Sequence, residues 1–341
     1  MALMNITKRP LTHMGRMRGR SFPGQHEYEQ TLYDLSEASV HRNFDPYIDI
    51  DWDSPELAVV PDDARWVCND RFDPIGRNEW YQAQPLEKQI AIGMWRQANV
   101  AKVGLQFESI LIRGIMQYTA AQPNDSIEFR YATHEAKEEC NHTLMFQEFV
   151  NRTGMDVPGG PWWFRRLSPI IPLFSTIAPL IFYMGVLAGE EPIDHLQKQF
   201  LRSGDTQHPA MTRIMQIHVA EEARHISFAH QLLERRIPTR GKFPQFLLSL
   251  AMPIVMRVLL GAIMVPPREF WETFDIPRSV KKDIFWRSPE SKAARVETFG
   301  DVRMLAERCD LMNPFSRVLW RVLGISGRSS RFRSEPSYSA Q

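Results

Sequence analysis

MQIHVAEEARHISFAH, which spans residues 215–230, is the stretch on which the fold depends. Within it, His218, Glu222 and His225 are spaced four and then three positions apart. Side chains with this spacing lie on one face of an α-helix, so the three groups project in the same direction. Two imidazoles and a carboxylate on one apolar helix face are costly to bury unless a cation lies between them. The stretch therefore predicts a helix that carries metal ligands.

A second Glu-x-x-His pair, Glu139 and His142, lies upstream and forms part of an internal repeat. Glu108 precedes Glu139 by 31 positions, and Glu191 precedes Glu222 by the same 31 positions. One Glu-x-x-His pair is a weak signal, because the two residue types fall three apart by chance in many helices. Two copies with matched spacing are a far more specific pattern.

The repeat has a geometric meaning because each copy has a turn signal at its midpoint. QPNDS occupies residues 122–126 in the first copy, and GDTQHP occupies residues 204–209 in the second. An α-helix rises about 1.5 Å per residue, so two equal arms bring the chain back to its starting height. Two such hairpins, packed face to face, place four carboxylates and two histidines at one level of a four-helix bundle. This is the arrangement of ferritin-like dinuclear carboxylate proteins.

The fold class predicted from this pattern is all-α, a ferritin-like four-helix bundle with additional helices and an irregular N-terminal arm. We expect the arm, with short helices, over residues 1–80. The bundle and its additional helices are expected over residues 81–325. A polar, serine-rich tail over residues 326–341 is expected to be disordered.

Helical periodicity places the long elements. Bundle helices are expected over residues 85–121, 126–152 and 209–236. The uncharged stretch 168–189 is long enough for a membrane span, but three prolines interrupt it, so we expect a core helix that leads to the third carboxylate. The apolar stretch 243–267 is expected to form packing helices, with docking on a membrane surface as the less favoured alternative.

Composition narrows the range of partners and compartments. The net charge of +1 gives no sign of a polyanionic partner, so nucleic acid is not expected. Cys68, Cys140 and Cys309 have no paired spacing, which argues against a disulfide framework and favours a reducing, cytoplasmic location. The basic N-terminus lacks an apolar segment, so it does not match a secretory signal. No dinucleotide-binding or iron–sulfur motif is found, so electrons are expected from an external donor.

The predicted metal ligands are the carboxylates and imidazoles that the repeat brings to one level, together with the histidine one turn before the last pair. They are Glu108, Glu139, His142, Glu191, His218, Glu222 and His225. Glu190 competes with Glu191, and His218 is alternatively a packed histidine. Mixed imidazole and carboxylate ligation suits iron, with manganese as the alternative, and carboxylates that can bridge suit two ions.

Polar neighbours of these ligands receive separate predictions. Glu138 is expected to be solvated, because it points away from the ligand face of its helix. Asp194 is expected either to orient a ligating histidine or to lie on the surface. His134, His195 and His230 are expected to be structural.

On these residues the chain resembles the AurF-type p-aminobenzoate N-oxygenases, which are non-haem di-iron enzymes of the ferritin-like superfamily. The most specific part of the resemblance is His218-x-x-x-Glu222-x-x-His225. Its extra histidine separates this family from ferritins, ribonucleotide reductase small subunits and bacterial multicomponent monooxygenases. The arm and the tail carry none of the resemblance.

The resemblance implies a homodimer, a di-iron site with four carboxylates and three histidines, and O₂-dependent oxidation of an aromatic amine by external electrons. It does not fix the substrate. Arg295 or Arg303 is a candidate anchor for a substrate carboxylate. Hydroxylation or desaturation of a lipid-like or other apolar substrate, a membrane-surface oxidase, and iron storage stay open as alternatives.

Overall fold

The computed structural model describes residues 24–203 and 207–335. Every regular element within these two ranges is helical, so the all-α prediction is confirmed. The predicted second turn falls partly outside the described residues, as do the first part of the predicted arm and the last part of the predicted tail.

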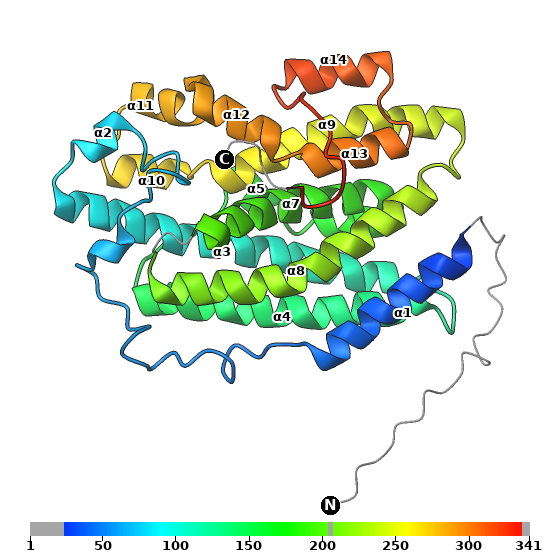
Figure 1. The fold of residues 1–341 in the computed structure, drawn as a ribbon, viewed down its shortest axis with the longest axis horizontal. Coiled ribbons are helices and arrows are strands. Elements are labelled where there is room, and N and C mark those ends of the chain that lie inside the picture. Colours follow the sequence, from blue (N-terminus) through cyan, green and yellow to red (C-terminus); the bar gives the residue numbers. More distant parts are fainter. Residues whose placement is uncertain (1–23, 204–206, 336–341) are drawn as a thin grey trace, which may run out of the picture.

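Four long helices form the central bundle (Figure 1). They are α3 (Leu86–Thr119), α4 (Ile127–Thr153), α7 (Pro179–Ser203) and α8 (Pro209–Arg236). Helices α3 and α4 pack as one hairpin and α7 and α8 as the other, and contacts between α4 and α8 and between α3 and α7 join the hairpins. This is the pair of hairpins that the repeat predicts.

The first hairpin turns where the sequence signal places the turn. Asp125 takes a left-handed conformation with φ of 65°, and the Ser126 side chain accepts a hydrogen bond from the backbone N–H of Phe129. Short polar side chains at this position satisfy the unpaired N–H groups of a helix start. At the other end of α4, Gly154 has φ of 64°, the conformation that commonly ends a helix at glycine.

The uncharged stretch 168–189 is not one core helix. Pro169, Pro172 and Pro179 divide it, because proline lacks a backbone N–H and its ring obstructs the preceding helical turn. Helix α5 (Trp162–Leu167) ends just before this stretch. Two short helices, η2 (Ile171–Leu173) and α6 (Phe174–Ile177), lie within it before α7 begins at Pro179. Helix α7 continues through Pro192 and carries the two competing carboxylates, Glu190 and Glu191.

Parts of the predicted arm and tail are ordered against the bundle. Residues 25–41 form α1 (Gln25–His41), a helix of 17 residues that packs on α4 and α8, so the arm is less irregular than predicted. Only η1 (Ala64–Trp66) and α2 (Glu79–Gln82) follow it among residues 42–85. The described part of the tail is held as well, because the side chain of Arg303 donates to the carbonyl of Arg328 and the N–H of Ser334 donates to Asp301.

Helix α9 (Lys242–Met264) covers α7 on the side of the bundle opposite α1 (Figure 1). Residues 242–273 are long and apolar enough to cross a membrane by length and composition, yet 44% of their most apolar window is buried in the structure. The remaining elements are α10 (Arg268–Thr273), α11 (Arg278–Lys282), η3 (Asp283–Arg287), α12 (Pro289–Glu297), α13 (Gly300–Arg308) and α14 (Pro314–Val322).

The buried apolar residues form two separate clusters, and the candidate ligands lie between them. Along α8, Ile214 and Ile217 belong to one cluster, whereas Ile226 and Phe228 belong to the other. His218, Glu222 and His225 fall in the gap. The bundle therefore carries its polar centre in the middle of an apolar interior.

One buried charge links four helices, and its loss should destabilise the fold. Glu128 on α4 accepts hydrogen bonds from Tyr28 (2.7 Å), Tyr118 (2.5 Å) and Arg236 (2.6 Å). We expect Arg236→Met to lower the free energy of unfolding by about 2 to 3 kcal/mol, because it leaves a buried carboxylate without its cation. Arg308→Met, which removes a largely exposed pair with Glu234, should cost less than about 1 kcal/mol. Equal effects in urea unfolding would contradict this role for Glu128.

Candidate metal centre

Six of the seven predicted ligands lie together in the middle of the bundle, and all six are buried. Helix α3 contributes one, α4 two and α8 three, and they are Glu108, Glu139, His142, His218, Glu222 and His225. Their donor atoms form two overlapping groups, in each of which the atoms lie within 4.8 Å of one another. His142 and Glu222 belong to both groups.

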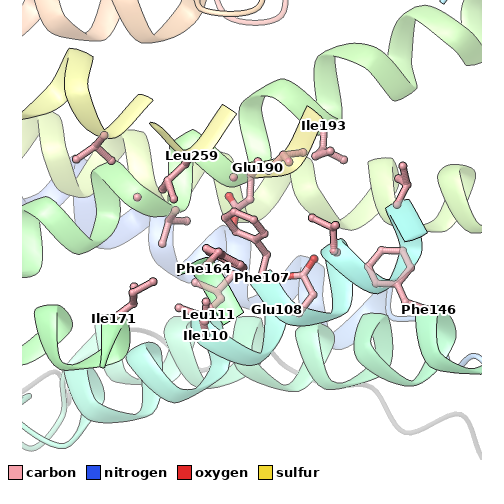
Figure 2. A pocket seen from close by; sticks show the side chains of 18 of the residues that line it. Phe107, Glu108, Ile110, Leu111, Phe146, Phe164, Ile171, Glu190, Ile193 and Leu259 are labelled. Atoms are coloured by element: carbon pink, nitrogen blue, oxygen red, sulfur yellow. The ribbon is translucent and has the colours of Figure 1, made fainter. Parts of the chain in front are cut away.

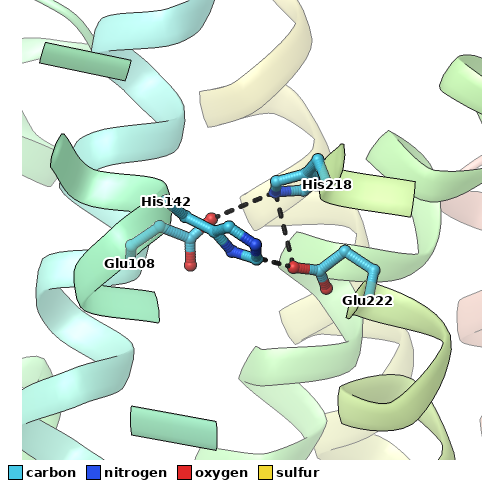
Figure 3. Close-up of side chains that lie close together, drawn as sticks. All are labelled: Glu108, His142, His218 and Glu222. Carbon is cyan, nitrogen blue, oxygen red and sulfur yellow. Dashed lines mark hydrogen bonds and ion pairs between the residues drawn. The ribbon is translucent and has the colours of Figure 1, made fainter. Parts of the chain in front are cut away.

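The first group joins α3, α4 and α8 (Figure 3). His218 Nε2 lies 3.4 Å from Glu108 Oε1 and 3.4 Å from Glu222 Oε1. His142 Nδ1 lies 3.5 Å from the same Glu222 oxygen. The four side chains surround one small space, with two carboxylates and two imidazoles directed into it.

The second group joins α4 and α8. His225 Nδ1 lies 2.7 Å from Glu139 Oε1 and 3.4 Å from Glu222 Oε1. His142 Nδ1 lies 3.0 Å from Glu139 Oε2. Because Glu222 and His142 face both groups, this geometry suits two neighbouring cations with a carboxylate between them.

Several buried atoms that could bind a metal lack a hydrogen-bond partner among the described residues, which fits the presence of a cation. Within the described part of the chain, neither oxygen of Glu222 makes a hydrogen bond, and the nearest partners of Glu139 Oε1 and His225 Nδ1 are each other, in the 2.7 Å ion pair. More than nine in ten buried polar groups in proteins do have such a partner. Oxygen and imidazole nitrogen atoms that converge on one buried space without hydrogen bonds are what a bound cation would satisfy.

Helix α7 presents Glu190, not Glu191, to this space. Both oxygens of Glu190 lack a hydrogen bond among the described residues, and its side chain lines the pocket beside Glu108 and His218. Glu191 is turned away and lies 2.5 Å from His230 Nε2. Glu190, the alternative to Glu191 in the sequence analysis, is therefore the better candidate ligand on α7.

The charges of the cluster reinforce this interpretation. Burial raises the pKa of Glu108 and of Glu190 well above the ordinary value, and neighbouring carboxylates raise both further. Burial also raises the pKa of Glu135, one turn before Glu139, to about 8, although His225 opposes the shift. Like charges so close together cannot all ionise unless positive charge compensates them.

The histidines differ in their response to the same surroundings. Burial lowers the pKa of His218 to about 4, so this imidazole is neutral and ready to bind a cation. Burial also acts to lower the pKa of His142, but contacts with Glu139 and Glu221 outweigh it and raise the pKa to about 10. A cation that binds His142 must therefore displace a proton, and its affinity should increase with pH.

A second layer of carboxylates orients the histidines, and the sequence did not reveal it. Glu221 Oε2 lies 3.0 Å from His142 Nε2, and Glu138 Oε2 lies 2.8 Å from His225 Nε2. Arg224 contacts both carboxylates, at 2.8 Å from Glu138 and 3.4 Å from Glu221. The expectation that Glu138 is solvated is wrong, since only 1% of this residue is exposed.

These contacts cross between the hairpins in a reciprocal way. The glutamate before Glu139 on α4 holds a histidine of α8, and the glutamate before Glu222 on α8 holds a histidine of α4. The only trace of this in the sequence is the doubled glutamate at residues 138–139 and 221–222. The remaining histidine of the cluster, His218, is oriented by an amide group, because Gln197 Oε1 lies 3.0 Å from its Nδ1.

Several other residues with predicted roles contact partners that the sequence analysis did not expect. Asp194 pairs with Lys198 at 2.6 Å and does not hold a ligating histidine. The two arginines proposed to anchor a substrate carboxylate serve the fold instead: Arg303 donates to the backbone carbonyls of Val296 and Ile325, and Arg295 donates to that of Phe285. Cys140 is exposed, as expected for a side chain that points away from the cluster.

A pocket of 340 Å³ adjoins the cluster, with Glu108, Glu190 and His218 among its lining residues. Figure 2 shows the two carboxylates among the apolar side chains of the pocket wall. The candidate centre therefore has one face open to a space where a small molecule can bind.

Comparison with known proteins agrees with this geometry. A family model described as P-aminobenzoate N-oxygenase AurF matches residues 25–310. Among curated proteins, the chain is 59% identical over 310 residues to an uncharacterized protein of Mycobacterium tuberculosis and equally to one of Mycobacterium bovis. Each alignment covers 91% of this chain and 91% of the relative.

Isosteric substitutions separate the two candidates on α7. We expect Glu190→Gln to lower metal content or to weaken metal affinity at least about tenfold, because a neutral amide is a poorer ligand than a carboxylate. Glu191→Gln is the matched control and should bind as much metal as the wild type. Elemental analysis after equilibrium dialysis against Fe²⁺ or Mn²⁺ measures both, and the reverse outcome would return the ligand role to Glu191.

The reciprocal carboxylates should matter almost as much as the ligands. Glu138→Gln and Glu221→Gln each keep a hydrogen-bonding side chain but lose the charge that supports the histidine. Changes of this type commonly weaken metal binding about 10- to 100-fold. Titration calorimetry with Mn²⁺ measures the change, with Glu234→Gln on the exposed side of α8 as control. Wild-type affinity in both variants would mean that the second layer only fills space.

Proposed function

The chain belongs to the AurF family of p-aminobenzoate N-oxygenases, and we propose that it is a non-haem di-iron oxygenase that oxidises an aromatic amine. The observation that carries this proposal is the pair of overlapping ligand groups, sharing His142 and Glu222, at the inner end of a pocket. Two adjacent ferrous ions can deliver electrons to O₂, which a redox-inert zinc ion cannot do.

Seven residues of the chain would hold the ions in this proposal. They are Glu108, Glu139, His142, Glu190, His218, Glu222 and His225, with Glu190 in place of the predicted Glu191. Glu222 would be shared between the two ligand groups, since three histidines lie within 3.5 Å of its Oε1, whereas Glu139 lies near two histidines and belongs to one group. Manganese stays an alternative, because the same ligand types suit it.

The chain's own contribution is orientation and exclusion of water. Glu138 and Glu221 fix the outer nitrogens of His225 and His142, so that the inner nitrogens face the shared space. The apolar wall of the pocket keeps water from the reacting atoms, which favours oxidation of the bound molecule over loss of the oxidant to solvent.

The reaction requires more than this chain supplies. Oxidation of an arylamine to the hydroxylamine consumes O₂, two electrons and two protons, and it releases one water. We propose an external electron donor, a homodimeric assembly and a cytoplasmic location, in line with the expectations from the sequence. Hydroxylation or desaturation of a lipid-like molecule is the second candidate, favoured by the apolar lining of the pocket.

The test uses full-length protein loaded anaerobically with two equivalents of Fe²⁺. With a chemical reductant, ¹⁸O₂ and a panel of arylamines, we expect a product that is heavier by one ¹⁸O atom, measured by mass spectrometry. Glu222→Ala should form no product above background, because it removes the carboxylate shared by both ligand groups. Glu234→Ala, on the same helix but outside the cluster, should retain activity.

Two outcomes would contradict the proposal. Oxygen uptake that ends in ferric mineral, without consumption of any amine, would favour an iron-storage role. Labelled product from alkyl substrates but from no arylamine would favour the hydroxylase or desaturase alternative.

A further inference from the structure

The pocket beside the metal centre has a wall of almost uniform chemistry. Each of the helices α3 to α9 contributes to it, and most of the side chains are aliphatic or aromatic. Phe107 and Phe164 are stacked with ring centroids 4.7 Å apart, and Leu259 reaches the same space from α9 (Figure 2). A wall of this type binds apolar surface, which contributes about 25 cal/mol for each Å² removed from water.

The polar groups of the pocket are gathered at its metal end. They are Glu108, Glu190, Gln197 and His218, and the lining contributed by the described residues includes no lysine and no arginine. Two buried acids therefore face any ligand that approaches the centre. A carboxylate at the far end of the ligand would lie against the apolar wall and lose its hydration without gaining a lysine or arginine partner.

Gly185 on α7 makes room for the ligand, whereas Gly189 is required by packing, because a Cβ there would lie 3.0 Å from the ring of Phe107. Gly185 and Gly189 lie one turn apart within the helix and both line the pocket. Glycine inside a helix costs about 1 kcal/mol relative to alanine. A Cβ atom at Gly185 would meet only Leu259 Cδ1, at an ordinary contact distance of 3.8 Å. Packing against the protein does not require glycine at 185, so the missing side chain leaves space in the pocket itself.

The size and the opening of the pocket set the length of the ligand. Its volume of 340 Å³ is about twice that of an engineered apolar cavity of about 150 Å³ that binds benzene. Phe174 on α6 and Ile254 and Val258 on α9 line the pocket and are also 43%, 46% and 47% exposed. The pocket therefore opens to the surface between α6 and α9 through apolar side chains.

From these features we propose that the substrate is an uncharged arylamine with an apolar substituent comparable in size to the ring itself, and that Gly185 determines this specificity. The inference rests on the proposed function. The amine lies at the end bounded by Glu108 and Glu190, and the apolar substituent extends toward the opening between α6 and α9. p-Aminobenzoate, whose carboxylate would be buried in this wall, is a poor ligand of this chain.

Equilibrium binding under anaerobic conditions tests the ligand class without turnover. Iron-loaded full-length protein is titrated with 4-butylaniline and with p-aminobenzoate in a calorimeter. We expect 4-butylaniline to bind at least about tenfold more tightly, because each buried CH₂ group contributes about 0.8 kcal/mol. Equal or tighter binding of p-aminobenzoate would overturn the proposal.

Two substitutions at one position test the role of Gly185. Gly185→Leu should fill the pocket and weaken 4-butylaniline binding at least about tenfold, at unchanged iron content. Gly185→Ala, a smaller change that favours the helix, should weaken it less and guards against misfolding of the first variant. Gly261→Leu on α9, outside this pocket, is the matched control and should bind like the wild type. Wild-type binding by both Gly185 variants would overturn the assignment.

Failure of this inference and failure of the proposed function give different results. If 4-butylaniline binds in the pocket but is not oxidised by the reduced, iron-loaded protein with O₂, the ligand class stands and the N-oxygenase function fails. If p-aminobenzoate is oxidised with a lower KM than 4-butylaniline, the function stands and the ligand class fails.

Discussion

Mutual repulsion of buried carboxylates is the constraint on which the structure depends. Glu108, Glu139, Glu190 and Glu222 are all more than nine-tenths buried within one bundle, together with three imidazoles. Burial and repulsion raise the pKa of Glu108 and of Glu190, so the charged forms of these two acids are disfavoured in the absence of compensating charge. The two apolar clusters on either side of this level supply the hydrophobic stabilisation that holds such a centre together.

The second layer joins α4 and α8, one helix from each hairpin, into one support for the centre. Glu138 and Glu221 each reach across to the histidine of the opposite hairpin, and Arg224 contacts both carboxylates. Each histidine is thereby oriented through its outer nitrogen, which leaves the inner nitrogen for a cation. The apolar pocket then completes the site by admitting a ligand on the one face that this support leaves open.

Regular helix geometry explains how much the sequence could predict. Matched spacing fixes height along a bundle, so the repeat located five candidate ligands on three helices, and the spacing of His218 from Glu222 added the sixth. It does not fix direction: neighbouring residues differ by about 100° around a helix, and only packing on the other helices decides between Glu190 and Glu191. Glu138 was misjudged for the same reason, because its partner Arg224 lies on another helix. Helix α1 is longer than the short helices expected in the arm, because Tyr28 and Leu32 are its only buried large apolar residues and give little helical periodicity.

The crossed contacts of Glu138 and Glu221 also bear on how the protein assembles. Each hairpin orients a histidine that belongs to the other hairpin. In a chain in which only one hairpin has folded, neither ligand group is therefore correctly oriented. Sliding one hairpin past the other by a single turn, about 5.4 Å, would release both histidines together. Glu138 and Glu221 thus hold the two hairpins in one relative position along the bundle axis. The ability of the centre to bind metal is then gained or lost as a whole with the complete bundle.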